Sequence, residues 1–292
     1  MKEQWYFMIS MVIFGAVGIF ARYIDCSSRK IAFYLALIGA VFWLVTVIRK
    51  KRTVSWHQLR RNRRALILSG VALSGNWIFL FQAYKETTIA NAALSYYSAP
   101  IQVMVFSAIL LQERLSKKKI AGVAVAFLGL TILLQQGAGI SSAHHVLGIF
   151  YGLIAAVFYA ALTLLNASMR DLGGLDRTIV QLGLSAIMLF PYVLVTDGLS
   201  LSGMTGNAIA MLIFLGIVHG GIGFYLFFAG MAGLGAQSIA VLSYIDPLTS
   251  LAVSVLILRE GMTMLQLFGA MLVLSAIAMA ERSPRTTKKQ KG

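Results

Sequence analysis

Ten long apolar runs restrict the fold of this sequence more than any other feature. A bilayer core about 30 Å thick is crossed by roughly 20 helical residues at about 1.5 Å each, and each run is close to that length. The runs are too long and too uniformly apolar for the alternating strands of a membrane barrel, so helices are the expected spanning form. The predicted spans are 4–24, 31–48, 65–84, 88–112, 118–136, 146–168, 177–197, 207–229, 237–258 and 264–281. The sequence therefore predicts an all-α polytopic membrane protein with ten transmembrane helices, set in the lipid bilayer of a cell membrane.

The placement of basic residues explains the net charge of +15, which in a soluble protein would suggest a nucleic-acid partner. With the N-terminus in the cytoplasm, 20 of the 25 lysines and arginines fall in cytoplasmic segments. This is the positive-inside pattern, so both termini are expected in the cytoplasm and no nucleic-acid partner is expected. The most basic segment, 49–64, is interpreted as a topology anchor, with anionic-lipid binding as the alternative.

The sequence also contains an internal repeat. Residues 92–113 align without a gap to residues 239–260, which pairs Tyr97 with Tyr244 and Pro100 with Pro247, and residues 68–83 align to 214–229 at an offset of 146. The predicted organisation is a first five-helix repeat, an external linker, a second five-helix repeat and a basic cytoplasmic tail, at 1–137, 138–145, 146–281 and 282–292. Because five is odd, the second repeat enters the membrane from the opposite side, as in several secondary transporters whose binding site lies at the repeat interface.

Each repeat has a proline well inside an apolar run. A proline lacks one backbone donor and clashes with the carbonyl four residues earlier, which is that of Tyr96 for Pro100 and that of Ser243 for Pro247. A carbonyl left without a hydrogen-bond donor is tolerated at membrane depth where it faces protein or a water-filled cavity. We expect the two prolines to act as hinges that flank one central chamber; the alternative is that each is a packing kink.

Two ionisable residues lie within predicted spans. Asp246 is the only acid deep in a predicted span. Because burying a carboxylate in the membrane costs free energy, its presence predicts proton coupling or recognition of an amine. The alternative is a protonated or helix-capping acid. The counterpart of Asp246 in the first repeat is Ala99. His219 is either a proton relay or a hydrogen-bonded packing residue.

Aromatic and polar residues on the same helices are further candidates for the chamber wall. Aromatic rings suit an apolar solute or an ammonium group. The aromatic candidates are Trp77, Phe81, Tyr96, Tyr97, Tyr159 and Tyr244. The polar ones, which line the chamber or bond a neighbouring helix, are Asn76, Gln82, Ser95, Gln102 and Asn166.

Charges near the span ends have structural interpretations. Glu113 and Glu260 are expected to pair with the neighbouring Arg114 and Arg259. No lysine or arginine lies deep in a predicted span, so a phosphorylated solute finds no partner and a neutral, zwitterionic or cationic one is expected. The spacings Gly216-x-x-x-Gly220 and Gly148-x-x-x-Gly152 predict close contacts between helices.

Ten helices in two halves, a proline in the fourth helix of each, and the segment ILLQERLSKKKIAGVAVAFLGLTILL at 109–134 resemble the EamA-type drug/metabolite transporter superfamily. Its pattern of a glutamate, a short loop and a glycine-containing helix falls on Glu113 with Gly122 and on Glu260 with Gly269. Within the superfamily the chain is similar to the YddG-like aromatic amino-acid exporters of bacterial inner membranes.

This resemblance implies export of amino acids or related metabolites by alternating access, without a cofactor or a metal, by a monomer or a homodimer. The alternative is a drug or hydrophobic-cation exporter with proton antiport through Asp246. No GxxxxGK[ST] motif is present, so transport is expected to be secondary or facilitative, and no motif of an intramembrane enzyme is found.

Overall fold

The computed structural model describes residues 2–17, 20, 24–87, 92, 95–110, 112, 116–134, 143–169, 171–256 and 263–281, and the regular elements among them are all helices. Five of the described helices are long and apolar enough to cross a membrane by length and composition. They are Arg29–Arg49, Arg63–Ala83, Val146–Ser168, Gly174–Thr196 and Gly206–Met231. The chain is an all-helical, multi-pass membrane protein.

The first half contains α1 (Lys2–Gly15), α3 (Ser28–Arg49), α5 (Arg63–Glu86), α7 (Ala99–Leu110) and α8 (Lys117–Leu134). The hydroxyl of Ser27 caps α3 by accepting a hydrogen bond from the Lys30 amide. A short helix that the sequence did not predict, α4 (Trp56–Arg61), lies in the basic segment between α3 and α5.

The second half contains α9 (Ala143–Ser168), α10 (Gly174–Thr196), α11 (Gly206–Leu215), the π-helix η1 (Gly216–Gly223), α12 (Phe224–Met231), α13 (Ala236–Leu242), α14 (Ile245–Leu256) and α15 (Met264–Glu281). Helices α11, η1 and α12 follow one another without a gap and cover the predicted span 207–229.

The helix is interrupted in front of each predicted hinge proline. A turn at Tyr97 and Ser98 precedes Pro100, and a turn at Ser243 and Tyr244 precedes Pro247. The expectation that Pro247 leaves the Ser243 carbonyl unmet is wrong, because that carbonyl accepts the amide of Asp246 at 3.2 Å. The tighter turn thus supplies the donor that the proline lacks.

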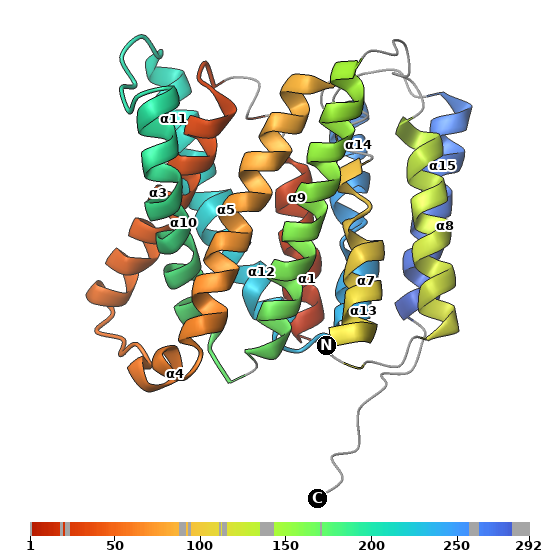
Figure 1. Cartoon of the computed structure of the whole chain (residues 1–292), viewed down its shortest axis with the longest axis horizontal. Helices are drawn as coiled ribbons and strands as arrows, with labels where there is room; N and C mark the ends of the chain where they lie inside the picture. The colour runs from red at the N-terminus through yellow and green to blue at the C-terminus, as the bar shows by residue number, and fades with distance from the viewer. Residues whose placement is uncertain are drawn as a thin grey trace, which may run out of the picture.

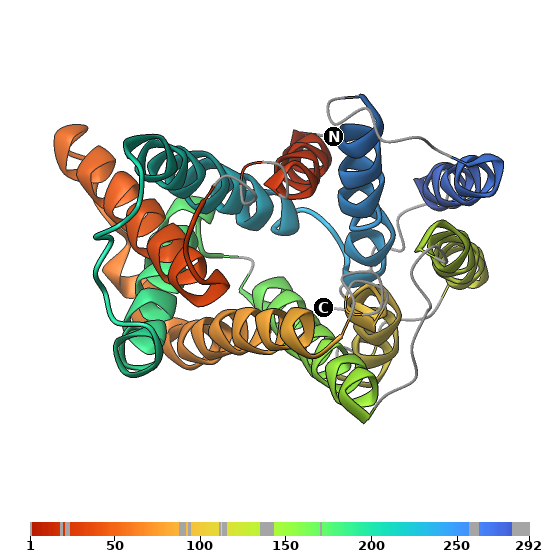
Figure 2. The same ribbon diagram turned by 90° about the horizontal axis from the view of Figure 1, so that it is seen from above.

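The helices form an elongated ring, with α3 and α10 near one end and α8 and α15 at the other (Figures 1 and 2). Helices α1 and α9, which open the two halves, run in opposite directions in Figure 1. The upper and lower sides of the molecule are named below as in that figure.

The helix contacts are preserved when the two halves are exchanged. Helix α5 packs on α9 as α12 packs on α1, α5 packs on α10 as η1 packs on α3, and α7 packs on α9 as α14 packs on α1. The correspondence extends to single residues. A Cβ atom on Gly70 would lie 2.7 Å from that of Leu184, and one on Gly216 would lie 2.6 Å from that of Ile38. The two glycines are 146 positions apart in the sequence, and so are their contact residues Ile38 and Leu184.

The glycines of η1 allow its backbone to touch the backbone of α3. A Cβ atom on Gly39 would lie 2.6 Å from the carbonyl carbon of Gly220, and the indole of Trp43 donates a hydrogen bond to the carbonyl of Gly221 at 2.8 Å. Gly148 lies equally close to Thr87. The predicted close helix contacts at these glycines are confirmed.

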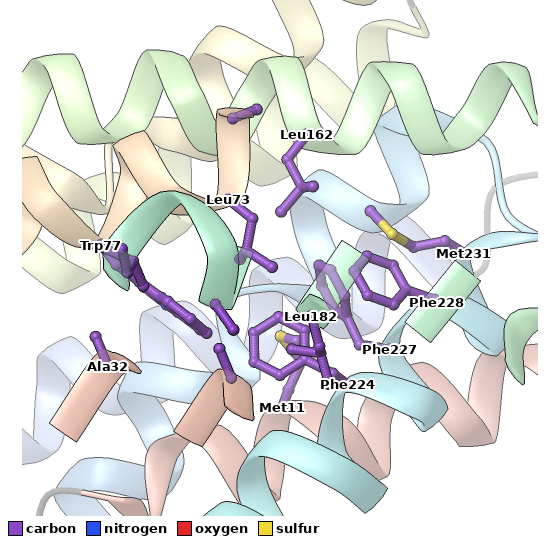
Figure 3. Packing of buried hydrophobic residues seen from close by; sticks show 14 of the residues in the cluster. Met11, Ala32, Leu73, Trp77, Leu162, Leu182, Phe224, Phe227, Phe228 and Met231 are labelled. Carbon is purple, nitrogen blue, oxygen red and sulfur yellow. The ribbon is translucent and has the colours of Figure 1, made fainter. Parts of the chain in front are cut away.

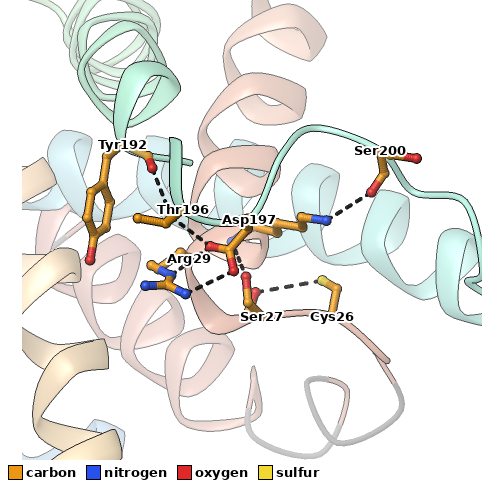
Figure 4. A network of polar contacts seen from close by, with 8 residues as sticks. Cys26, Ser27, Arg29, Tyr192, Thr196, Asp197 and Ser200 are labelled. Carbon is orange, nitrogen blue, oxygen red and sulfur yellow. Dashed lines mark hydrogen bonds and ion pairs between the residues drawn. The ribbon is translucent and has the colours of Figure 1, made fainter. Parts of the chain in front are cut away.

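On the upper side, polar contacts join the start of α3 to the residues after α10; we call them the upper clamp (Figure 4). The Arg29 guanidinium forms an ion pair with Asp197, with Nε 2.7 Å from Oδ2, and also donates from Nη2 to Oδ1 at 2.9 Å. Lys30 donates to the carbonyl of Ser200, and the Tyr34 hydroxyl donates to that of Leu199. The upper clamp therefore ties the two halves together.

The lower side has a corresponding set of contacts, the lower clamp, which joins the α3–α5 connection to the α9–α10 connection and the first turn of α10. The Ser55 amide donates to Asp176, and both Arg61 and Asn62 contact Asp171. Beside it, Arg177 is fully buried and donates to the carbonyls of Asn166 and Met169 at the end of α9. Arg177 is one of the 20 basic residues predicted to lie in cytoplasmic segments, but its side chain is buried and holds the end of a helix.

The upper clamp predicts a pH-dependent contribution to stability. Burial raises the pKa of Asp197, but hydrogen bonds from Arg29 and Thr196 outweigh this and hold that pKa below its usual range. Because the folded-state pKa is lowered, the stabilisation is present above the unfolded pKa of about 3.9 and is lost as the pH falls through the folded value. Asp197→Asn should lower the unfolding free energy by about 1 kcal/mol at pH 7, and the difference should be smaller at about pH 3, which lies below the unfolded pKa of about 3.9. Thermal unfolding of the wild type and of Asp197→Asn at the two pH values checks this prediction. Asp25→Asn, which removes an exposed acid nearby, is the control. An equal loss of stability in Asp197→Asn at both pH values would contradict the prediction.

Candidate functional site

A cavity of about 540 Å³ lies between the two halves. Its wall is formed by α1, α3, α5 and the start of α7 with the turn before it from the first half, and by α9, η1, α12 and the start of α14 with the turn before it from the second. A volume of this size is in the range that holds a small organic molecule. The site is thus built at the interface of the repeats and belongs to neither half alone.

Most of the residues selected from the sequence reach this cavity. Those that line it are Asn76, Trp77, Phe81, Tyr96, Tyr97, Pro100, Tyr159, His219 and Asp246. Tyr244 and Pro247 do not line it. The turn at Ser243 and Tyr244 directs Ser243 to the cavity, whereas Tyr244 is fully buried in a separate apolar cluster with Val103, and its hydroxyl donates to the carbonyl of Tyr97 at 3.5 Å.

Asp246 lies in the first turn of α14, directly after the helix break. Its Oδ1 accepts a hydrogen bond from the hydroxyl of Tyr97 at 3.4 Å, so the contact joins the two halves. Beside it, the hydroxyls of Tyr159 and Ser243 are 3.0 Å apart. The carboxylate therefore sits among hydroxyl groups at the cavity wall.

Aromatic rings in sequential contact extend around the cavity from the neighbourhood of Asp246; we call them the aromatic belt. Tyr97 contacts Tyr96 at 5.6 Å between ring centroids, and Tyr96 contacts Tyr159 at 6.0 Å. Tyr159 contacts Phe227, which contacts Phe224. The remaining members around Phe224 are Trp77, Phe14 and His219. All eight line the cavity, so aromatic rings cover a substantial part of its wall.

His219 and Asn76 supply further polar groups. His219 is held in η1 against the ring of Phe14, with 4.6 Å between the centroids, and its buried Nδ1 has no hydrogen-bond partner among the described residues. Asn76 lines the cavity and also donates a hydrogen bond to the carbonyl of Ala155 in α9. It therefore both faces the chamber and bonds a neighbouring helix. The other polar candidates bond neighbouring groups and do not line the cavity; these are Gln82, Ser95, Gln102 and Asn166.

The charge of the site is one-sided. Of the described residues that line the cavity, Asp246 is the only acid, and none is a lysine or an arginine. The predicted pairs of Glu113 with Arg114 and of Glu260 with Arg259 lie outside the described residues.

Several lining residues were not selected from the sequence, among them Met11, Phe14, Phe224, Phe227 and Ser243. Apolar residues on an apolar helix carry no signal for the side that faces a cavity, since lipid and protein core demand the same chemistry. Figure 3 shows Met11, Trp77, Phe224 and Phe227 converging with buried neighbours such as Leu182 and Phe228. Leu182 and Phe228 belong to the same buried cluster but do not line the cavity.

Comparisons with known proteins agree with this architecture. The pattern of the EamA-like transporter family matches residues 1–135 and 146–281. The transporter YxxF of Bacillus subtilis is 29% identical over 93% of this chain and 87% of its own length, and a transporter of Archaeoglobus fulgidus is 27% identical over 94% of each. A "probable amino-acid metabolite efflux pump" of Salmonella typhimurium is 27% identical over 71% of this chain and 73% of its own length. A solved crystal structure covers 96% of this chain and 98% of its own with a TM-score of 0.83 at 19% identity, which shows the fold alone.

Proposed function

Because the chain belongs to the EamA-like transporter family, we propose that it is a secondary or facilitative carrier that exports amino acids or related small metabolites by exposing its central cavity to either side of the membrane in turn. The observation that carries this proposal is the cavity itself, whose wall is divided between the two halves. A site at such an interface changes its access when the halves tilt against each other. Nothing in the sequence resembles an ATP-binding loop, which favours transport driven by gradients.

The halves act in this proposal as inverted repeats with both termini in the cytoplasm. Support comes from the opposite directions of α1 and α9 and from helix contacts that are preserved on exchange of the halves. The basic residues of 49–64 on the lower side and their absence from 198–206 on the upper side fit a cytoplasmic lower side.

Site-directed labelling checks this orientation. In a Cys26→Ser background, Arg60→Cys on the lower side and Ser202→Cys on the upper side should react with an impermeant thiol reagent from opposite faces of intact cells or oriented vesicles. Both positions are exposed, so each provides the other's control for reactivity. Labelling of both from one face would refute the inverted arrangement.

For the solute, we infer amino acids, especially aromatic or other neutral ones. The relative from Salmonella typhimurium carries a name of that kind, and an aromatic wall with a few hydroxyl groups suits such a molecule.

Reconstitution tests the carrier function. Proteoliposomes preloaded with one unlabelled amino acid at a time should take up the same radiolabelled compound with saturation and with acceleration by the internal pool. Both features require a site that faces one side at a time. Flux that rises linearly with concentration and ignores the internal pool would indicate a channel instead.

The prolines provide a test of the hinges. Pro100→Ala and Pro247→Ala restore an amide that can extend the following helix across the preceding turn, so we expect turnover to fall several-fold while the yield of folded protein changes little. Pro191→Ala, at an exposed position within α10, is the matched control. Wild-type turnover in both hinge variants would reduce these prolines to packing features.

A further inference from the structure

Asp246 marks the cavity as a site for a positively charged group. It is the only charged residue among the described residues lining the cavity. In surroundings of low polarity, a charged solute group needs a partner of opposite sign. A cation finds one here, whereas an anion finds only uncharged donors.

The carboxylate has capacity left for such a partner. A carboxylate offers about four lone-pair sites, and the described contact of the Asp246 side chain is the hydroxyl of Tyr97 at 3.4 Å. The rings of Tyr97 and Tyr96 begin the aromatic belt at this place, and ring faces attract a cation within about 6 Å of their centroids. The same rings cover the apolar part of a solute.

The chain contains its own comparison for the role of this acid. Ala99 is the counterpart of Asp246 in the first repeat, follows the other helix break and also lines the cavity. A break in front of a proline is therefore formed in this fold without a carboxylate. The fold therefore does not require an acid at position 246, and this supports a role for Asp246 in binding the solute.

We propose that the cavity binds its solute through a protonated amino group held by Asp246, with the apolar part of the solute against the aromatic belt, and that a carboxylate on the solute is dispensable. This deepens and rests on the proposed carrier function, because it names the group that the site recognises. It extends the substrate class from amino acids to monoamines that carry an aromatic or apolar group.

Three probes of one skeleton separate the groups: 2-phenylethylamine has only the amine, phenylalanine has both groups, and 3-phenylpropionate has only the carboxylate. Binding of each to the purified full-length protein in detergent is measured by scintillation proximity, which avoids passive leakage of the amine through a membrane. We expect the two amine-bearing probes to bind, with 2-phenylethylamine at least as tight as phenylalanine, and 3-phenylpropionate to bind about tenfold more weakly or not at all.

Variants of Asp246 supply the second arm. Asp246→Asn keeps the shape and removes the charge, so the Kd of 2-phenylethylamine should rise about tenfold or more; Asp246→Glu should restore much of the loss. Asp25→Asn, which removes an exposed acid outside the cavity, is the matched control and should bind as the wild type does. If Asp246→Asn fails to fold, the order of the three probes on the wild type and the Asp246→Glu variant decides the question.

The proposal is overturned if 3-phenylpropionate binds as tightly as the amine, if neither amine-bearing probe binds, or if folded Asp246→Asn keeps wild-type affinity. The carrier function stands or falls separately by the counterflow assay. If an amino acid is exchanged saturably but the amine-bearing probes do not bind preferentially, only the proposed amine site is refuted. If the amine binds but no counterflow is observed, only the proposed carrier function is refuted.

Discussion

Replacing Gly39 with valine should leave little or no folded protein. The first carbon of any side chain at this position would lie 2.6 Å from the carbonyl carbon and 2.8 Å from the carbonyl oxygen of Gly220. These are backbone atoms of η1 and they have no rotamer by which to move away. Overpacking a well-packed core typically costs about 1–3 kcal/mol and more where backbone must shift, against a total stability of about 5–15 kcal/mol. The yield of monodisperse protein in size-exclusion chromatography measures the effect.

Gly183→Ala is the matched control for this substitution. Gly183 also lies inside a described helix, α10, but a Cβ atom there meets nothing within 4 Å. An alanine in such a place is neutral or stabilises the helix by up to about 1 kcal/mol. If Gly39→Val and Gly183→Ala gave equal yields, the close approach of α3 and η1 would be disproved.

Truncation of Arg177 should have the second-largest effect on stability. Its guanidinium is fully buried and donates to the carbonyls of Asn166 and Met169, which end α9. Arg177→Ala removes both charge-assisted hydrogen bonds, leaves the two buried carbonyls without these donors and opens a void, and these losses together cost about 3 kcal/mol. We expect a clear fall in the thermal unfolding temperature in detergent.

Two further substitutions make this result specific. Arg177→Lys keeps the charge but has no planar fork that reaches both carbonyls, so its loss should be intermediate. Arg63→Ala removes an exposed arginine of the same lower side and should change stability by less than about 0.5 kcal/mol. Equal unfolding temperatures for Arg177→Ala and Arg63→Ala would show that the buried contacts contribute nothing.

The sequence predicted the number and order of the membrane segments because length and hydrophobicity decide them, and the duplicated prolines located the two helix breaks. It did not predict the π-helix at Gly216–Gly223, since a change from four- to five-residue hydrogen bonding depends on how the glycines meet α3. The burial of Arg177 was also missed. A cation at a span end has the same pattern whether it faces water or caps a neighbouring helix.

The sequence allows cavity-lining residues to be selected where they contrast with their surroundings. Asp246, His219 and Asn76 are polar within apolar helices, and all three line the cavity. Phe14 and Phe227 give no such contrast, because a membrane helix is apolar on every face and its hydrophobic pattern does not point inward. Tyr244 was misplaced for a geometric reason: the turn before Pro247 rotates it away from the direction that an unbroken helix would give.

The pairing of Asp246 with Ala99 across the repeat has a kinetic consequence. A carrier made of two equivalent halves would present the same chamber to the compartments on both sides of the membrane. A solute that bound the inward-facing and the outward-facing states equally well would not shift the equilibrium between these two states. One acid on one half removes that equivalence, so the half-saturating concentrations on the two sides are free to differ. Detailed balance still fixes the final distribution across the membrane unless a second gradient is coupled. In the proposed carrier, Asp246 would therefore influence the transport rate in each direction at low solute concentration, whereas the gradients across the membrane would determine the net direction.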